Sequence, residues 1–418
     1  MSGPDDDRFI PAAELMPLAE ALAILSERLV PITGAETVPL AEALYRTLAE
    51  TVVAGRDVPP HDNSAVDGYA VHAADLTAAA ETRLPVTGRI AAGHPLGRPA
   101  RRGEALRILT GAPMPEGPDT VVMQEDCRRE GDEVVLGSGV KPGANRRRRG
   151  EDIRRGDAIL KPGIRLRAQE IGLAASVGRA ELQVRERLKV AVFSTGDEVR
   201  EPGGNAPAGC IYDANRYTVM ALLRGLGCEL TDLGILPDDP DTIRGALAAA
   251  ATAHDLLTTS GGVSVGDEDH VKAAVEALGG LHFWRVAIKP GRPIALGRIG
   301  DATFIGLPGN PVSAMVTFML IARPVILRLS GRTEVEPARF PVRAGFTFRK
   351  KPGRREWLRA HLERLPDGGL RAVKFDADGS GILTSMVAAE GLVEVAESAE
   401  TVNEGDPLEF LPFSEMCL

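Results

Sequence analysis

The chain has 418 residues, of which 44% are hydrophobic and 26% charged, and its formal net charge is −9. This length predicts two to four domains, and the mean hydropathy of −0.04 excludes both a disordered chain and a protein made of membrane spans. The negative net charge argues against nucleic-acid binding through the overall field. Any anionic ligand therefore has to be bound by local basic groups.

The spacing of cysteines and histidines indicates the cellular compartment and whether a metal site is present. The four cysteines show no CxxC or other metal spacing, which predicts reduced thiols in a cytoplasmic protein. The seven histidines contain no HxxxH pair, which argues against a zinc site. The N-terminal stretch MSGPDDDRF is acidic and lacks an apolar core, so we expect no signal peptide.

The N-terminal half predicts one domain inserted into another. Residues 11–55 and 152–186 read as helix and mixed structure, and we expect them to pack together as a discontinuous linking domain. Residues 56–151 carry many Pro and Gly and the short β-type runs LPVTGRI, ALRILTG and DTVVMQED. These runs predict a small β-rich inserted domain.

Strand and helix patterns alternate over residues 187–331. The runs LKVAVFST, CELTDLGIL, HDLLTTSGG and TFIGLPG predict strands, and RYTVMALLRGLG, DDPDTIRGALAAAA and DEDHVKAAVEALGG predict helices. The apolar run VSAMVTFMLIA is cut by Arg323 and Pro324, which predicts a buried helix and no membrane span. Repeated βα units predict a doubly wound α/β domain with a mostly parallel sheet and helices on both faces.

Residues 332–418 become strand-like again in the runs RFPVRAGFTF, LRAVKF, LVEVA and PLEFLPF. This pattern predicts a C-terminal β-barrel. The expected fold class is therefore multidomain α/β plus β, with the α/β domain third along the chain.

Three loops of the α/β domain follow predicted strands: STGDE, TSGGVSVGDED and GLPGNP. The carboxyl ends of parallel strands share one edge, where helix N-termini add partial positive charge. In the second loop, small residues with bare N–H groups suit a phosphate, while three neighbouring carboxylates suit a cation. A phosphate ligand accompanied by a divalent metal satisfies both halves.

Two basic patches are candidate anion sites: NRRRRG (Asn145–Gly150) and KPGRP (Lys289–Pro293). The four arginines of the first are equally consistent with a solvated face. In the second, glycine and prolines fix the backbone beside two cations.

The stretch PPHDNSAVDGYAV (Pro59–Val71) is by itself a turn of Asp, Asn, Ser and Gly. Together with RILTGAPMPEGPDTVVMQED, RRRRGEDI, STGDE, IYDANR, TSGGVSVGDED, WRVAIKPGRP and GLPGNPVS, it resembles the molybdopterin molybdenumtransferase (MoeA) family, which includes the C-terminal domain of gephyrin. These motifs keep the family order from about Glu14 to Phe413.

The resemblance implies an elongated four-domain homodimer in the cytoplasm. Its substrates are adenylylated molybdopterin and molybdate. The reaction cleaves the phosphoanhydride with the help of Mg²⁺, releases AMP and leaves molybdenum on the pterin dithiolene. Implied partners are a molybdopterin adenylyltransferase and recipient molybdoenzymes, and neither nucleic acid nor a membrane is expected.

The resemblance also assigns residues. Its catalytic positions fall on Asp67, Thr110, Asp152, Glu198, Asp238 and Asp269. Glu198 and Asp269 are the expected Mg²⁺ ligands, as hard oxygen donors suit that ion. Asp67 and Asp152 lie in other domains and are expected to reach the α/β rim across the dimer interface. Asp238 has an alternative interpretation as a helix cap.

Expected binding residues for the pterin substrate are Thr195, Gly196, Ser260, Gly261, Gly262 and Ser264, and for molybdate Lys289, Arg292, Ser313, Arg359 and Ser380. Cations with hydroxyl donors suit a tetrahedral dianion. Arg285 and Arg292 stand where the family often carries Lys, which makes these two positions planar and bidentate. Trp284 and Trp357 are interpreted as packing residues.

Two other functions compete with this one. A molybdopterin adenylyltransferase shares the α/β domain and a similar TSGG loop, but needs neither the inserted domain nor the barrel. A scaffold protein, as gephyrin is at synapses, has no need of the carboxylates. Release of AMP from adenylylated molybdopterin and molybdate separates the three.

Overall fold

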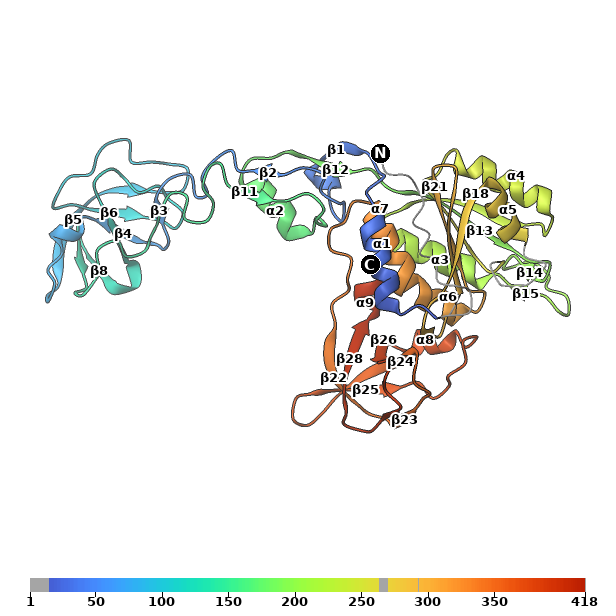
Figure 1. Ribbon diagram of the computed structural model, residues 1–418. Helices are drawn as coiled ribbons and strands as arrows, with labels where there is room; N and C mark the ends of the chain where they lie inside the picture. The colour runs from blue at the N-terminus through green and yellow to red at the C-terminus, as the bar shows by residue number, and fades with distance from the viewer. Residues whose placement is uncertain (1–14, 263–269, 292, 418) are drawn as a thin grey trace.

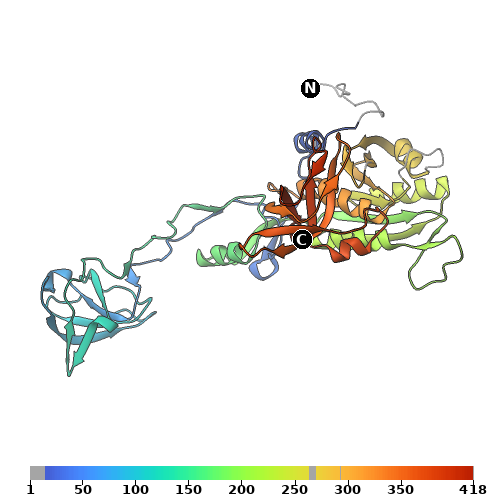
Figure 2. The same ribbon diagram turned by 90° about the horizontal axis from the view of Figure 1, so that it is seen from below.

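The computed structural model describes residues 15–262, 270–291 and 293–417. The molecule is elongated, with a β-rich part at one end and the α/β and barrel parts at the other (Figures 1 and 2). A thin linking region joins the two ends.

The β-rich end contains one curled six-stranded sheet in the order β7-β4-β6-β5-β9-β8. Its strands are β4 (Gly68–Val71), β5 (Thr82–Ile90), β6 (Ala105–Ile108), β7 (Thr120–Met123), β8 (Cys127–Glu130) and β9 (Glu133–Leu136), with short 3-10 turns η2 (Ala73–Asp75) and η3 (Gln124–Asp126). The three predicted runs fall on β5, β6 and β7, so the β-rich prediction is confirmed here.

The linking region is made of paired segments from both sides of the β-rich part. Strand β1 (Ala35–Pro39) pairs with β12 (Glu181–Arg185), β2 (Val52–Val53) with β11 (Ala158–Leu160), and β3 (Asn63–Ser64) with β10 (Arg146–Arg147), and the region also holds η1 (Leu40–Glu42) and α2 (Ala168–Ser176). Leu48, Leu166 and Leu182 are completely buried in its core. Residues far apart in sequence therefore build one unit.

Helix α1 (Leu18–Arg28) packs elsewhere. Its buried residues Leu18 and Ala21 belong to the same apolar cluster as Val325 and Leu329 of the α/β part, and Figure 1 shows α1 beside α7. Part of the segment 11–55 thus contacts the α/β part directly. The four-domain division remains our proposal.

The α/β part has a six-stranded sheet in the order β16-β13-β17-β21-β20-β18, in which only β20 runs against its neighbours. The strands are β13 (Lys189–Thr195), β16 (Glu229–Leu236), β17 (Leu256–Ser260), β18 (Gly279–Arg285), β20 (Pro293–Ile299) and β21 (Ala302–Leu307), and the helices are α3 (Ala214–Gly225), α4 (Pro240–Ala251) and α5 (His270–Leu278). A small arm pairs β14 (Val199–Arg200) with β15 (Ile211–Tyr212).

Side chains alternate across this sheet as its period of two requires. Val190 and Val192 of β13 face the cluster that contains α3, while Ala191 and Phe193 face the cluster that contains α4 and α5. Helices therefore cover both faces, and the doubly wound prediction is confirmed.

One long helical segment forms the centre of the core. It runs through α6 (Pro311–Thr317), the π-helical stretch η4 (Phe318–Ala322) and α7 (Arg323–Leu329). Pro324 falls in the first turn of α7, where a missing N–H is tolerated, and the wider π turns before it accommodate the ring. The segment is long and apolar enough to cross a membrane, with mean hydropathy 1.7, but 83% of it is buried inside the protein, as expected for a core helix.

The C-terminal part is a closed five-stranded barrel, because β24 pairs with both β25 and β26. Its strands are β22 (Phe340–Ala344), β24 (Arg355–Arg364), β25 (Leu370–Lys374), β26 (Gly391–Val395) and β28 (Pro407–Pro412), accompanied by β23 (Phe348–Arg349), β27 (Thr401–Val402), α8 (Thr384–Ala388) and α9 (Phe413–Met416). Strand β19 (Ile288–Lys289) of the α/β part adds to the edge of β24. The two parts thus share one ladder.

We expect Phe318→Ala to lower the free energy of unfolding of the α/β part by about 3–5 kcal/mol, because it leaves a cavity in the core. Phe318 is only 1% exposed within the largest apolar cluster. Val387→Ala is the control, since Val387 is 85% exposed and should change stability by no more than about 0.5 kcal/mol. Urea denaturation measures both, and equal effects would contradict the core assignment.

Candidate active site

A cavity of about 440 Å³ opens at the carboxyl ends of β13 and β17. Its lining contains seven of the predicted residues, Thr195, Gly196, Glu198, Asp238, Ser260, Gly261 and Gly262, together with Ser194, Asp213, Asn215, His270 and Gly309. We call this cavity the rim pocket. Its position agrees with the rule that ligands bind beyond the strand ends of open α/β sheets.

Two glycines are required by the close packing of the rim pocket. Gly262 has φ +66°, and a Cβ there would lie 2.7 Å from Oγ1 of Thr195. Gly196 has φ +126°, and a Cβ there would lie 2.6 Å from a carboxylate oxygen of Glu198. A side chain at either position would be strained and would displace a predicted site residue.

Not every N–H of the TSGG loop is available to a ligand. The N–H of Gly261 donates to the carbonyl of Leu307 at 3.0 Å. This bond extends the β17–β21 ladder into the loop, so Gly261 contributes its shape to the pocket. The first turn of α3 borders the pocket through Ala214 and Asn215, and the first N–H groups of a helix have no acceptor within the helix.

Asn215 ties the loops of the rim pocket together. Its Nδ2 donates to Oγ of Ser260 at 2.8 Å and to the carbonyl of Gly309 at 2.6 Å, while Ser260 Oγ donates to the carbonyl of Pro308 at 3.0 Å. The motif IYDANR marked this region, but no residue in it was assigned to the site from sequence. The signal that identifies Asn215 is its place in the first turn of a helix at the same rim.

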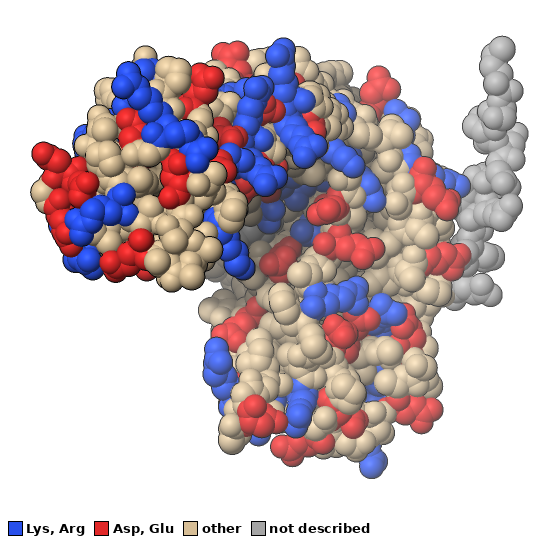
Figure 3. Space-filling model, turned by 90° about the vertical axis from the view of Figure 1, so that its left-hand side faces the viewer, with Lys and Arg blue, Asp and Glu red and all other residues tan. Residues whose placement is uncertain are grey.

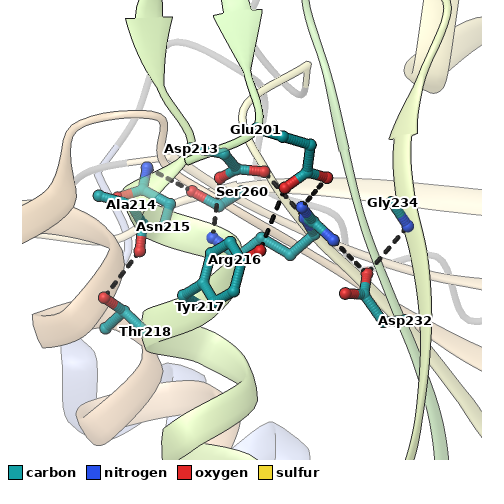
Figure 4. Close-up of polar contacts among 10 residues, drawn as sticks. All are labelled: Glu201, Asp213, Ala214, Asn215, Arg216, Tyr217, Thr218, Asp232, Gly234 and Ser260. Atoms are coloured by element: carbon teal, nitrogen blue, oxygen red, sulfur yellow. Dashed lines mark hydrogen bonds and ion pairs between the residues drawn. The ribbon is translucent and has the colours of Figure 1, made fainter. Parts of the chain in front are cut away.

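A buried arginine fixes the wall around Asn215 (Figure 4). Arg216 is only 2% exposed. Its guanidinium binds Asp213 at 2.9 Å and also Asp232 and Glu201, three carboxylates from three segments. Burial alone would lower the pKa of Arg216, but the bonds to Asp213 and Asp232 outweigh burial and raise it. The group is therefore a permanent cation that holds α3, β16 and the β14–β15 arm together.

Asp238 does not cap helix α4, because the neighbouring Asp239 does. Helix α4 is capped by Asp239, whose carboxylate accepts from the N–H of Thr242 at 2.8 Å and from its hydroxyl at 2.6 Å. Asp238 instead lines the rim pocket. Its predicted catalytic role stays a proposal.

A second cavity, of about 300 Å³, lies between the α/β part and the barrel. We call it the cationic pocket. Four predicted molybdate residues, Lys289, Ser313, Arg359 and Ser380, line it, together with Arg354, Glu356, Trp357 and Asp378. Residues from the α/β part and from the barrel thus converge in one cavity.

Arg359 is held in place by the barrel itself. It is 4% exposed, and its guanidinium donates to Ser385 Oγ at 3.0 Å and to the carbonyl of Ala377 at 2.8 Å. Burial lowers the pKa of Arg359, yet a guanidinium remains charged at neutral pH. Trp357, interpreted from sequence as a packing residue, is completely buried and also lines the pocket.

The first turn of α6 joins the two pockets. Pro311 lines the rim pocket and Ser313, two residues later, lines the cationic pocket. That step is about 3 Å along a helix axis. Between them, the N–H of Val312 donates to the carbonyl of Ser380 in the barrel at 3.0 Å.

Asp67, Thr110 and Asp152 lie in a different part of the molecule. Asp67 precedes β4 and Asp152 follows β10, whereas β13 and α3 of the rim pocket lie at the opposite end (Figure 1). The structure does bring two of them together: Thr110 donates to Asp67 Oδ1 from its N–H and from its hydroxyl, both at 2.7 Å. These bonds, the backbone one first, hold the pKa of Asp67 below its ordinary value.

Three predicted residues, Ser264, Asp269 and Arg292, lie outside the described residues. Among the residues that are described, no group of three or more His, Cys, Asp or Glu side chains is arranged to hold a metal. The predicted Mg²⁺ pair of Glu198 and Asp269 therefore stays a prediction.

The fold defines a multidomain protein with one pocket on the rim of an α/β sheet and an adjoining cation-lined pocket beside a barrel. Family models match its three parts: MoeA N-terminal region (domain I and II) over residues 16–178, probable molybdopterin binding domain over 191–328, and MoeA C-terminal region (domain IV) over 341–413. The chain belongs to the MoeA family.

Full-length relatives support this assignment. The chain is 39% identical over 404 residues to a molybdopterin molybdenumtransferase of Haemophilus influenzae, covering 96% of this chain and 100% of that one. It is 35% identical over 383 residues to molybdopterin molybdenumtransferase 2 of Mycobacterium tuberculosis, covering 89% and 94%. The crystal structure of the molybdopterin biosynthesis MoeA protein from Pyrococcus horikoshii superposes with a TM-score of 0.82 at 30% identity, covering 96% and 100%.

We expect Thr110→Val to raise the pKa of Asp67 toward the ordinary Asp value, because the hydroxyl donor is lost while the N–H donor remains. Since the native pKa is depressed, Asp67 stays ionised to lower pH than a free Asp, and the variant protonates earlier as pH falls. The carboxyl ¹³C shift of Asp67 against pH measures this. Thr242→Val, which removes the equivalent bond to Asp239, is the matched control, and a larger shift of Asp67 in that control would contradict the assignment.

Proposed function

We propose that the protein inserts molybdenum from molybdate into adenylylated molybdopterin, hydrolysing the phosphoanhydride and releasing AMP, in the cytoplasmic synthesis of the molybdenum cofactor. The rim pocket binds the phosphates, and the cationic pocket binds molybdate. Family membership supports the reaction class. A molybdopterin adenylyltransferase that delivers the substrate and molybdoenzymes that take the product are the proposed partners.

The single observation that carries this proposal is the junction of the two pockets at the first turn of α6. The substrate must present its phosphates at one site and its dithiolene sulfurs near a bound oxyanion. Two adjoining pockets of opposite character, carboxylate-lined and cation-lined, meet that need. An adenylyltransferase needs only the first of them, and a scaffold needs neither.

The chain's own residues bind and orient both substrates. Asn215 and Ser260 keep the rim loops in register around the phosphates. Lys289 and Arg359 replace the water of the dianion with charged donors, and Ser313 and Ser380 add hydroxyl donors. Fixed donors lower the cost of bringing the two reacting groups together.

The residues of the rim pocket fit a Mg²⁺ ion. In the described part of the chain its wall carries Glu198 and Asp238 but no Lys or Arg, so the phosphates lack a cation from the protein. The hydroxyl of Ser194 is buried there with no hydrogen-bond partner among the described residues. We propose Glu198 as a ligand, with Asp269 as predicted from sequence, and the ion when bound would neutralise phosphate charge.

We propose a homodimer in which the β-rich end of one subunit completes the rim pocket of the other. Six of the eleven large exposed apolar side chains of the described chain, Leu15, Val30, Ile32, Leu44, Tyr45 and Val53, lie between residues 15 and 53. Such a concentration indicates a covered surface.

Charge complementarity supports the same arrangement. Residues 141–187 carry thirteen Lys and Arg against six Asp and Glu, whereas residues 196–241 of the rim carry nine acidic residues against three Arg. Lys and Arg side chains crowd the upper part of the face in Figure 3, above a hollow. The basic stretch 141–187 of one subunit thus suits the acidic rim of its partner.

Mixing Asp67→Asn and Glu198→Gln subunits should restore AMP release, because a heterodimer contains one site with both residues intact. A 1:1 mixture should regain about a quarter of wild-type activity, since half the dimers are mixed and each has one good site. The matched control is Asp67→Asn with Asp152→Asn, which damages both shared sites and should restore nothing. Failure of the first mixture would rule out a shared site.

Arg359→Lys should raise the molybdate concentration for half-maximal AMP release by about tenfold, because the charge remains but the planar fork that binds Ser385 and Ala377 is lost. Affinity for adenylylated molybdopterin should change little. Arg364→Lys, at the far end of β24, is the control. Equal weakening of both substrates would mean that Arg359 holds the two parts together and does not bind molybdate.

A further inference from the structure

A buried carboxylate lies in the wall of the cationic pocket. The side chain of Glu356 is 3% exposed, and its Oε2 lies 3.0 Å from Nζ of Lys289. Both residues line the pocket with Arg354 and Arg359. A carboxylate beside a site for a dianion opposes binding, since like charges repel strongly where water is excluded.

The ion pair is not what joins the barrel to the α/β part. Backbone pairing already aligns Ile288 with Arg355 and Lys289 with Glu356, and the N–H of Arg355 donates to the carbonyl of Ala287 at 2.8 Å. The side chain of Lys289 is 44% exposed. An ion pair with a partner this exposed contributes little stability. The carboxylate therefore needs another explanation.

Its position has two effects on an incoming oxyanion. Glu356 holds the ammonium group of Lys289 against the wall, so this cation is already neutralised when the ligand arrives. The carboxylate also repels the ligand directly. Both effects weaken the binding of molybdate before reaction. Weaker ground-state binding favours transfer where the repulsion is relieved as the molybdenum moves toward the dithiolene, because only a difference between ground state and transition state speeds the chemical step.

We propose that Glu356 is a positioning residue that sets the affinity of the cationic pocket for tetrahedral dianions, keeping molybdate bound loosely enough to be transferred to the dithiolene. This inference rests on the proposed function, in which that pocket is the molybdate site. Glu356 acts through Lys289 and through its own charge. It makes no bond to the reacting atoms.

Isothermal titration calorimetry on the full-length protein tests the proposal with two probes of the same shape, molybdate and the monoanion perrhenate. Glu356→Gln keeps a hydrogen-bond acceptor for Lys289 but removes the charge. We expect the dissociation constant for molybdate to fall about tenfold or more, and that for perrhenate only about threefold, because the repulsion scales with ligand charge.

Glu363→Gln is the matched control. Glu363 lies on the same strand and is paired with Arg371 at 2.8 Å, but seven residues further along it is about 23 Å away. This variant should bind both anions like the wild type. In steady-state assays, Glu356→Gln should lower the half-saturating molybdate concentration and also lower AMP release at saturation, a combination that structural damage does not produce.

The possible results distinguish an error in the proposed pocket from an error in the role of Glu356. Failure of both the wild-type protein and Glu356→Gln to bind molybdate would overturn the proposed pocket itself. If the wild type binds but Glu356→Gln is unchanged or weaker, or if both anions gain equally, the role of Glu356 is wrong and the pocket stands. Glu356→Ser, which also removes the charge, is measured in parallel, and failure of both variants to fold would show a structural carboxylate and overturn the proposal.

Discussion

Burial of the helical segment Pro311–Leu329 is the constraint on which the site depends. Its apolar side chains fill the space between the sheet, the barrel and α1, so the segment has no freedom to shift. Because its first turn borders both pockets, fixing the helix fixes the distance between them. The helix–barrel bond from Val312 to Ser380 then aligns the barrel with the same turn. Two substrates are thereby positioned by one rigid element.

Much of the fold follows from sequence because its strands are apolar and bounded by turn residues. Strand β13 keeps Val, Ala and Phe buried on both faces, which is the pattern of a parallel strand covered by helices. Strand β24 had no such signal. It buries Glu356 and Arg359 beside Trp357, and charged residues buried by ion pairs and carbonyl bonds hide the period-two pattern that identifies a strand.

The site could be predicted from sequence only in part. Lys289, Ser313, Arg359 and Ser380 were named from the resemblance, and the structure places them in one pocket, yet their roles stay proposals. Glu356 was missed because a carboxylate has no obvious place in an oxyanion site. Only the register of β19 against β24 puts it beside Lys289. That pairing joins positions 67 residues apart, beyond any local pattern.

Each pocket contains carboxylates whose charge opposes the binding of its proposed anionic ligand. The rim pocket is lined by carboxylates although its proposed ligand is a pyrophosphate, and the cationic pocket contains Glu356 and Asp378 although its proposed ligand is a dianion. In each case the opposing charge lowers the affinity for a free anion. Free phosphate is then a poor ligand without a cation, and free molybdate is held weakly beside Glu356. A site built this way holds its oxyanion loosely, which favours transfer of the metal to the pterin over retention in the pocket.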